Sequence, residues 1–189
     1  MANNKKTFLN ALEDYRNNGN KANDGYKGNL FEGCVKAYLG NFKGSLVSAR
    51  GAIDTRKKLN TGEIVSFEIK QGQGELGILD KEGNIVSTCL TRDYMITCYK
   101  FNPDEPVEVQ AHVLSMEVYV SMMNELNLIG TKYSSQQYNN PDPYTRYHDR
   151  LCIKQMSTPK RAKIRQAFID SYEGLGMTLE DFCNEYLMR

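Results

Sequence analysis

The segment at residues 63–71, E-I-V-S-F-E-I-K-Q, restricts the fold more than any other stretch of this chain. Its apolar side chains alternate with polar ones, and a period of two indicates a β-strand with one buried face. The polar face of this strand carries both Glu68 and Lys70. We therefore expect a carboxylate and an ammonium group to lie side by side on one face of a sheet.

A second strand is predicted at residues 46–53, and the turn residues Asn60-Thr61-Gly62 between the two runs are a hairpin signal. Asp54 comes at the end of the first strand. Facing side chains of antiparallel neighbours lie about 5 Å apart. The hairpin is therefore expected to bring the carboxylates of Asp54 and Glu68 within reach of one ion.

Capping residues and helical spacing of apolar residues predict the other elements. Helices are expected at residues 6–16, 30–39, 115–128, 157–173 and 179–187, and further strands at 93–101 and 150–155. The polar segments 17–28 and 130–149 are predicted as loops. From residue 29 onward the order α–β–β–β–α–β–α–α indicates an α/β (α+β) protein.

Composition limits the kind of protein and the kind of metal site. A chain of 189 residues with no repeat or long linker fits a single domain, and its apolar runs are too short to span a membrane. Without an apolar leader in its first residues, the chain is expected to stay in the cytoplasm. Five scattered cysteines and two histidines predict reduced thiols and no zinc site. A metal would be a hard ion held by carboxylates.

Mg²⁺ or Mn²⁺ suits such a site because these ions take oxygen ligands, commonly one or two carboxylates together with a substrate phosphate. The ion activates a water molecule and neutralises charge on a scissile phosphate, while Lys70 orients that water or steadies the transition state. The main-chain carbonyl of Ile69 points to the same place and is a candidate third ligand. The alternative is a surface hairpin with solvated charges, because an acid followed by acid-x-Lys also occurs by chance.

The arrangement resembles the PD-(D/E)XK phosphodiesterase superfamily, which has this order of elements and an E-x-K strand. The resemblance covers residues 29–155, and the runs A-R-G-A-I-D, E-I-K-Q-G-Q-G-E-L and D-Y-M-I-T-C-Y look like small nucleases of bacteriophages and mobile elements. It implies a restriction-endonuclease-like core, with a mixed central sheet flanked by helices and a C-terminal helical extension at residues 157–189.

The resemblance also implies roles for individual residues. Glu32 matches the glutamate of the first helix, Asp54 and Glu68 match the two metal ligands, and Lys70 matches the lysine of the motif. Ile53 stands where the name of the motif has proline. That position varies in such folds and has no chemical role.

Basic residues gather in two strips, although the net charge is only +1. We predict that both strips bind the phosphates of DNA, the second because it lies at a helix N-terminus. A solvated charged face is the alternative for such a run. The predicted DNA-binding residues are Arg56, Lys57, Lys58, Lys160, Arg161 and Lys163.

Two other features of the sequence each allow two interpretations. The tyrosines of residues 130–149 suit stacking on unpaired bases or contact with a protein, and equally suit a loop folded back on the core. Glu75 extends the acidic site or caps a turn.

Two functions fit these observations. The first is a Mg²⁺- or Mn²⁺-dependent DNA endonuclease or DNA-processing nuclease of a phage or mobile element. The second is a non-catalytic nuclease-fold protein of a phage, such as an anti-CRISPR type inhibitor, that binds DNA or a host defence protein. Both act in the host cell cytoplasm. A homodimer would suit double-strand cleavage, although nothing in the sequence marks an interface.

Overall fold

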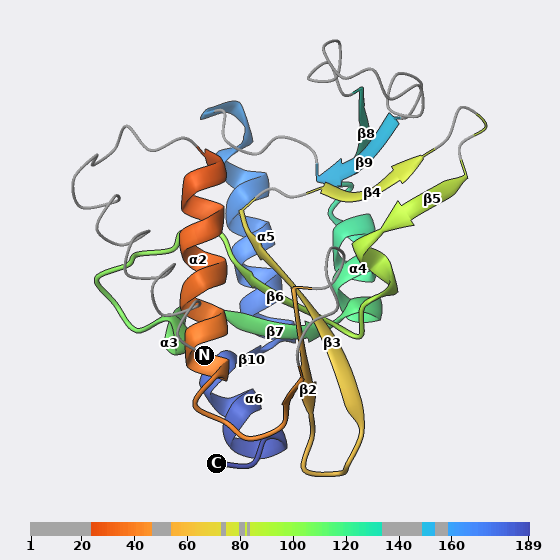
Figure 1. Cartoon of the computed structure of the whole chain (residues 1–189). Helices are drawn as coiled ribbons and strands as arrows, with labels where there is room; N and C mark the ends of the chain where they lie inside the picture. The colour runs from red at the N-terminus through yellow and green to blue at the C-terminus, as the bar shows by residue number, and fades with distance from the viewer. Residues whose placement is uncertain are drawn as a thin grey trace.

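A six-stranded mixed sheet forms the centre of the molecule (Figure 1). The computed structural model describes residues 24–46, 54–72, 75–79, 82, 84–133, 149–153 and 159–189. Within the sheet, β3 and β6 are parallel and all other neighbours are antiparallel. The strands in spatial order are β1 (Ser45–Leu46), β2 (Thr55–Lys58), β3 (Ile64–Gln71), β6 (Tyr94–Cys98), β7 (His112–Ser115) and β10 (Met177–Thr178).

Helices cover both faces of this sheet, so the predicted mixed sheet flanked by helices is confirmed. On one face α2 (Asp24–Leu39), α3 (Val107–Gln110) and α6 (Leu179–Tyr186) bury a cluster that includes Phe31, Phe67 and Phe182. On the other face α4 (Met116–Glu125) and α5 (Ala162–Leu175) bury a second cluster around Met95 and Phe168.

A second, four-stranded sheet lies at the upper right of Figure 1. Its order is β5 (Ile85–Thr88), β4 (Glu75–Leu79), β9 (Asp149–Ile153) and β8 (Ile129–Tyr133), and all its neighbouring strands are antiparallel. Only β9 was expected from the sequence, at residues 150–155. Glu75 is the first residue of β4.

The predicted hairpin is present, but its first strand is Thr55–Lys58 and not residues 46–53. Among the described residues of the expected strand, only Leu46 is in strand β1, and residues 47–53 lie outside the described residues. The turn closes with Leu59 N–H donating to the Glu63 carbonyl at 2.7 Å. Gly62 has φ of 93°, a conformation that favours glycine.

Strand β6 lies where residues 93–101 were predicted, and its residues Met95–Cys98 are buried. Asp93, immediately before it, fastens β6 to β3. One carboxylate oxygen of Asp93 accepts hydrogen bonds from the Ser66 N–H and hydroxyl, both at 2.6 Å. These two hydrogen bonds fix the register of the parallel strands β3 and β6, in which Glu68 lies opposite Met95.

Most predicted helices are found, with shifted ends. Helix α2 begins at Asp24, inside the segment predicted as a loop to residue 28, and ends at Leu39 as expected. Ser115 and Thr178 cap α4 and α6 through their hydroxyl oxygens, as predicted. The predicted helix at 6–16 and residues 134–148 of the predicted loop lie outside the described residues.

The C-terminal elements pack against the central sheet and its core. Strand β10 pairs with β7 at the end of the central sheet. The Leu179 N–H donates to the Ala111 carbonyl at 2.8 Å, and Phe182 packs edge-on against Phe67 of β3. Sequence periodicity found α6 but gave no sign of its non-local partners.

Candidate active site

The β2–β3 hairpin places Asp54 opposite Glu68. Thr55 pairs with Phe67, so the residue before Thr55 falls beside the residue after Phe67 in the continued register. The Asp54 Oδ2 accepts a hydrogen bond of 2.8 Å from the Ile69 N–H. Facing positions are about 5 Å apart. The two carboxylates therefore lie next to each other, as the sequence indicated, although Asp54 comes immediately before a strand instead of at the end of one.

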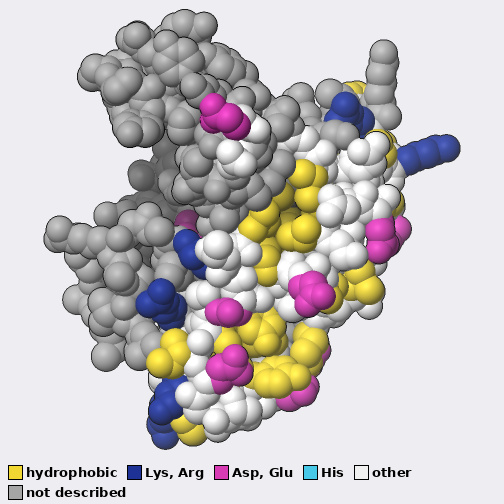
Figure 2. Space-filling model, turned by 90° about the vertical axis from the view of Figure 1, so that its right-hand side faces the viewer, with side chains coloured by type: hydrophobic (Ala, Val, Ile, Leu, Met, Phe, Trp, Pro, Cys, Tyr) yellow, Lys and Arg dark blue, Asp and Glu magenta, His cyan; other side chains and the backbone are white. Residues whose placement is uncertain are grey.

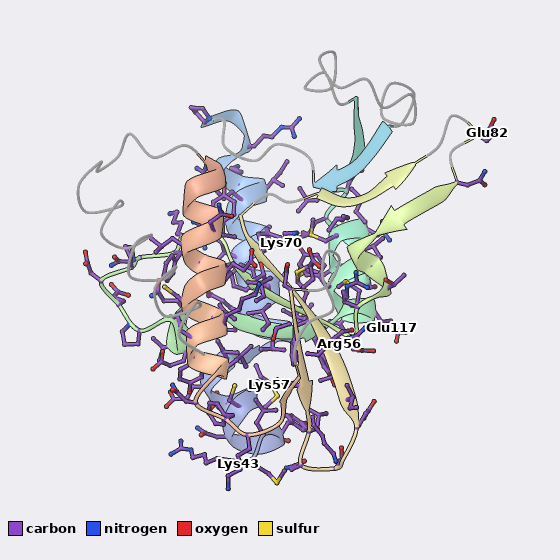
Figure 3. The ribbon with its side chains drawn as sticks, viewed as in Figure 1. Lys43, Arg56, Lys57, Lys70, Glu82 and Glu117 are labelled. Atoms are coloured by element: carbon purple, nitrogen blue, oxygen red, sulfur yellow. The ribbon has the colours of Figure 1, made fainter. Side chains whose placement is uncertain are left out.

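Glu68 and Lys70 share the face of β3 that looks toward α4 and α5. Glu68 lies beside Met95 in register, and Met95 belongs to the cluster buried by those helices. The Glu68 side chain is only 7% exposed and pairs with the Lys70 ammonium at 2.5 Å. Lys70, which is labelled in Figure 3, is 27% exposed, so it connects a buried carboxylate with the surface.

The surroundings of Glu68 disfavour the charged form of its carboxylate. Burial raises its pKa, while the hydrogen bond and the charge of Lys70 lower it, and the neighbouring charge of Asp54 raises it further. Arg92 also lowers the pKa of Glu68. A buried carboxylate with a raised pKa beside a second carboxylate is an arrangement found preferentially at functional sites.

The raised pKa makes a prediction about stability. Since folded Glu68 binds a proton more readily than unfolded Glu68, its contribution is complete below pH 4.5 and is lost as the pH rises through the folded pKa. Urea unfolding of the wild type and of Glu68→Gln across pH 4–8 isolates this term. We expect the stability of the variant, relative to wild type, to increase with pH over that window. A difference that is constant with pH would contradict the assignment.

The donor set fits a hard divalent cation. Asp54 and Glu68 offer carboxylate oxygens, which Mg²⁺ and Mn²⁺ prefer. The Ile69 N–H points toward Asp54, and the N–H and C=O of one strand residue point to the same side. The Ile69 carbonyl therefore faces the same edge as the acidic pair. Across the described ranges, no group of three or more His, Cys, Asp or Glu side chains is arranged to hold a metal.

Glu32 lies away from this pair. It stands on α2, which packs against the other face of β3 through Phe31 and Val35. Its carboxylate pairs with Lys36, one turn further along the same helix. The structure thus brings together three of the four predicted catalytic residues and gives the fourth a local partner.

The first basic strip is divided between surface and core. Lys58 is exposed and Arg56 is half-buried on β2. Lys57 is 1% exposed, and its ammonium donates to the main-chain carbonyls of Leu39 and Phe42, the latter at 2.9 Å. Burial lowers the pKa of Lys57. The expectation that Lys57 contacts DNA is therefore wrong for this structure, because its charge caps the C-terminal end of α2.

The second basic strip lies at the start of α5. Lys160 and Arg161 form the 3₁₀ turn Pro159–Arg161, and Lys163 is exposed on the first turn of the helix. The Arg165 guanidinium lies 6.0 Å from the centre of the Tyr99 ring, directly after β6. This contact places the strip at the end of the sheet that carries Lys70, because Lys70 and Thr97 are register partners.

Two residues that sequence reasoning left out contribute to the site. Arg92 acts on the charge of Glu68, and Asp93 fixes the register of β3 with β6. Neither has a local sequence signal, since both depend on the parallel pairing of strands far apart in the chain. The repeated Lys/Arg spacing after Pro159 is the signal that also marks Arg165.

Among the described residues, no helix has both the length and the apolar character needed to cross a membrane. No family model matches the chain, and the comparisons with curated proteins and with solved structures returned no match.

Proposed function

We propose that this chain is a Mg²⁺- or Mn²⁺-dependent DNA endonuclease or DNA-processing nuclease with a restriction-endonuclease-like core of the PD-(D/E)XK type. The observation that carries the proposal is the buried Glu68, held by Lys70 beside Asp54. A surface hairpin with solvated charges would leave the Glu68 side chain in water, whereas it is only 7% exposed. Because Lys70 is partly exposed, a substrate can reach the Glu68–Lys70 ion pair from the surface.

The surrounding fold supports the same proposal. The antiparallel β2–β3 hairpin is followed by the parallel strand β6, and helices cover both faces. The acidic pair lies just before β2 begins, and Glu68 occupies the second of the five register positions of the parallel β3–β6 pair.

In the proposed mechanism Asp54, Glu68 and the Ile69 carbonyl would hold the cation. The bound ion would supply an activated water and neutralise charge on the scissile phosphate. Lys70 lowers the pKa of Glu68 against the raising effect of burial, and its ammonium would donate a hydrogen bond to a phosphate oxygen as negative charge develops there. The Ile69 N–H holds the Asp54 carboxylate in one orientation. The chain thus fixes its charged groups before substrate arrives.

The DNA would approach the end of the sheet where the α5 basic strip and Lys70 meet. Lys163 is exposed there, and Arg165 is fixed against Tyr99. The face shown in Figure 2 is an unsuitable contact surface, since hydrophobic and acidic side chains fill its centre and basic side chains stand at its borders. Contacts to phosphate position DNA and provide no sequence reading.

The direct test is incubation of the protein with plasmid, linear duplex and single-stranded DNA, each with Mg²⁺, Mn²⁺ or EDTA. The proposal predicts metal-dependent cleavage of at least one substrate and none in EDTA. Intact DNA under every metal condition would overturn the catalytic proposal.

Removing one phosphate contact should weaken DNA binding without regard to sequence. We expect Lys163→Ala to reduce affinity several-fold, and to lower the salt-dependence slope by about one, because one fewer counterion is released. Fluorescence anisotropy in EDTA measures binding without cleavage. Lys43→Ala is the matched control, since Lys43 is also exposed but lies beside the last residues of the chain. Equal slopes for both variants and wild type would remove Lys163 from the interface.

A second function is favoured by the partners that the acidic residues already have. The Glu68 carboxylate is paired with the Lys70 ammonium, and the Asp54 carboxylate accepts a hydrogen bond from the Ile69 N–H. The Glu32 carboxylate is paired with Lys36. In such a site each carboxylate has a partner within the protein and needs no metal. This suits a phage protein that keeps the nuclease fold while binding DNA or a host defence protein. Under this alternative, Asp54→Asn and Lys70→Ala would leave inhibition of host defence unchanged. Loss of inhibition in both variants would exclude it.

A further inference from the structure

The ion pair between Glu68 and Lys70 engages the carboxylate that the proposed metal site needs. The Glu68 side chain is only 7% exposed, and its Oε1 lies 2.5 Å from the Lys70 Nζ. The two residues are two positions apart on β3, so their side chains stand on the same face of the strand. In the free protein the Lys70 ammonium therefore stands against the carboxylate that a cation would have to approach.

Four charged groups at this place balance one another. Asp54 adds a second negative charge to that of Glu68, and the positive charges of Lys70 and Arg92 both act on Glu68. Two negative and two positive charges cancel, so a divalent cation added here leaves an excess of two positive charges. Like charges that lie close together repel, and the repulsion is stronger where little water screens it. Lys70 and the cation therefore oppose each other at Glu68.

Lys70 is the member of the ion pair that can leave. Its side chain is 27% exposed, whereas the mostly buried Glu68 lies beside the buried Met95 of the next strand. A lysine ammonium ends a flexible four-carbon stem and has three donors that rotate freely. Lys70 can therefore turn toward the surface without a change in the strand. A DNA phosphate would give its ammonium an anionic partner there.

We propose that Lys70 couples the binding of metal to the binding of DNA. In the free protein Lys70 pairs with Glu68 and weakens metal binding. In the complex with DNA, Lys70 pairs with a phosphate and leaves Glu68 to the cation. The inference rests on the proposed nuclease function and adds its regulation, because the site takes up metal mainly when DNA is present. Such coupling is reciprocal, so the cation tightens DNA binding by the same factor.

Lys70→Met tests the coupling, because methionine keeps most of the length of the stem and removes the charge. Calorimetry at pH 8 measures Mn²⁺ binding with and without a duplex whose phosphorothioate linkages resist cleavage. Without DNA, we expect Lys70→Met to bind Mn²⁺ about fivefold more tightly than the wild type, at the lower end of typical coupling. DNA should tighten Mn²⁺ binding roughly tenfold or more in the wild type and by a smaller factor in Lys70→Met.

Lys36→Met is the matched control for the loss of one lysine charge. Lys36 also pairs with a glutamate, Glu32, and its side chain is similarly exposed at 31%. This pair lies on α2, which packs against the other face of β3. The Mn²⁺ affinity of Lys36→Met should equal that of the wild type with and without DNA.

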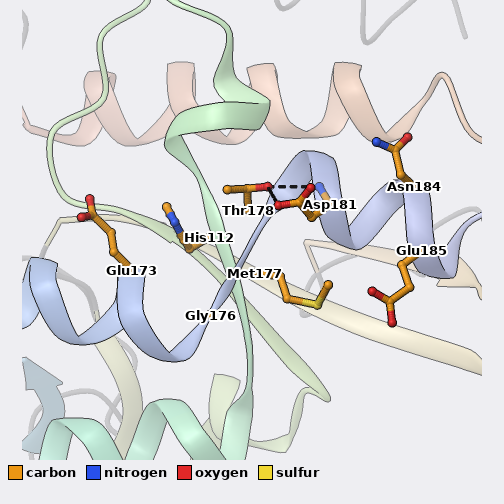
Figure 4. Close-up of a pocket in the computed structure, with 8 residues that line it drawn as sticks. All are labelled: His112, Glu173, Gly176, Met177, Thr178, Asp181, Asn184 and Glu185. Atoms are coloured by element: carbon orange, nitrogen blue, oxygen red, sulfur yellow. Dashed lines mark hydrogen bonds between the residues drawn. The ribbon is translucent and has the colours of Figure 1, made fainter.

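Mn²⁺ can also collect at carboxylates elsewhere on the protein. Glu173, Asp181 and Glu185 line a pocket at the β10 edge of the central sheet (Figure 4). Asp54→Asn separates these sites from the candidate active site. Only Mn²⁺ binding that Asp54→Asn weakens is therefore assigned to Asp54 and Glu68.

Nuclear magnetic resonance of the wild type follows Lys70 directly. In the free protein we expect a scalar coupling across the hydrogen bond, between the Lys70 ¹⁵Nζ and the Glu68 ¹³Cδ. With Mg²⁺ and the phosphorothioate duplex, this coupling should be lost and replaced by one between the Lys70 ¹⁵Nζ and a ³¹P nucleus of the DNA. A coupling to Glu68 that persists in the complex would overturn the inference.

The calorimetric results separate the inference from the proposed function. Without DNA, equal or weaker Mn²⁺ binding by Lys70→Met than by the wild type would overturn the inference and leave the proposed function standing. An equal effect of DNA on both proteins, or equal tightening by Lys36→Met, would do the same. No saturable Mn²⁺ binding to the wild type, with or without DNA, would overturn the proposed nuclease function and the inference with it.

Discussion

Asp54→Asn should remove metal-dependent DNA cleavage while leaving the protein folded. The substitution keeps the side-chain shape and an oxygen that can accept from the Ile69 N–H, but it removes a charged metal ligand. A catalytic metal contributes several kcal/mol, and about 1.4 kcal/mol corresponds to tenfold in rate. The expected loss is therefore on the order of a thousandfold, measured as the initial rate of plasmid nicking or linearisation.

Glu63→Gln provides the matched control, because Glu63 is an exposed carboxylate at the turn of the same hairpin. It should cleave at the wild-type rate. Circular dichroism and urea midpoints show whether Asp54→Asn is folded, and its stability should be equal to or above that of wild type since a repulsion with Glu68 is removed. Full cleavage by Asp54→Asn would end the catalytic assignment.

Lys57→Met should destabilise the fold by about 2–4 kcal/mol, the largest stability effect that we predict for a single polar side chain. Methionine replaces the length of the lysine stem but removes the ammonium donor from the carbonyls of Leu39 and Phe42, of which the Leu39 carbonyl keeps, among the described residues, only the Phe42 N–H at 3.2 Å. Leu39 ends α2 and Phe42 lies in the turn that follows it, and Figure 3 shows Lys57 near the lower end of that helix. Urea unfolding followed by circular dichroism measures the change.

Lys58→Met is the control for this substitution. Lys58 is the next residue on the same strand and is exposed, so a change within about 0.5 kcal/mol is expected. Similar losses in both variants would show that β2 tolerates neither methionine and would contradict the capping role. A urea midpoint of Lys57→Met equal to that of the wild type would also contradict the capping role of Lys57.

Local patterns predicted the elements that depend on neighbouring residues. The alternation in residues 63–71 predicted β3 and put Glu68 and Lys70 on one face. Ser115 and Thr178 predicted the starts of α4 and α6, because an N-cap bond joins residues three apart. The acidic pair followed from the hairpin turn, even though the first strand of the hairpin was misplaced.

Non-local pairings could not be predicted in this way. Strand β7 pairs with both β6 and β10, and the four-stranded sheet joins segments on either side of residues 134–148. Short strands have weak periodicity, so only their partners define them. Lys57 illustrates the same limit: T-R-K-K looks like a charged surface run, and its burial depends on carbonyls that a distant helix supplies.

Titration of the wild type with Mn²⁺, followed by the electron paramagnetic resonance of free Mn²⁺ and by calorimetry, tests most directly whether Asp54 and Glu68 form a metal site. We expect a saturable site in the wild type, weakened at least tenfold in Asp54→Asn and in Glu68→Gln, and unchanged in Glu63→Gln. Saturable binding that all three variants retain, or no binding to the wild type with or without DNA, would contradict this expectation.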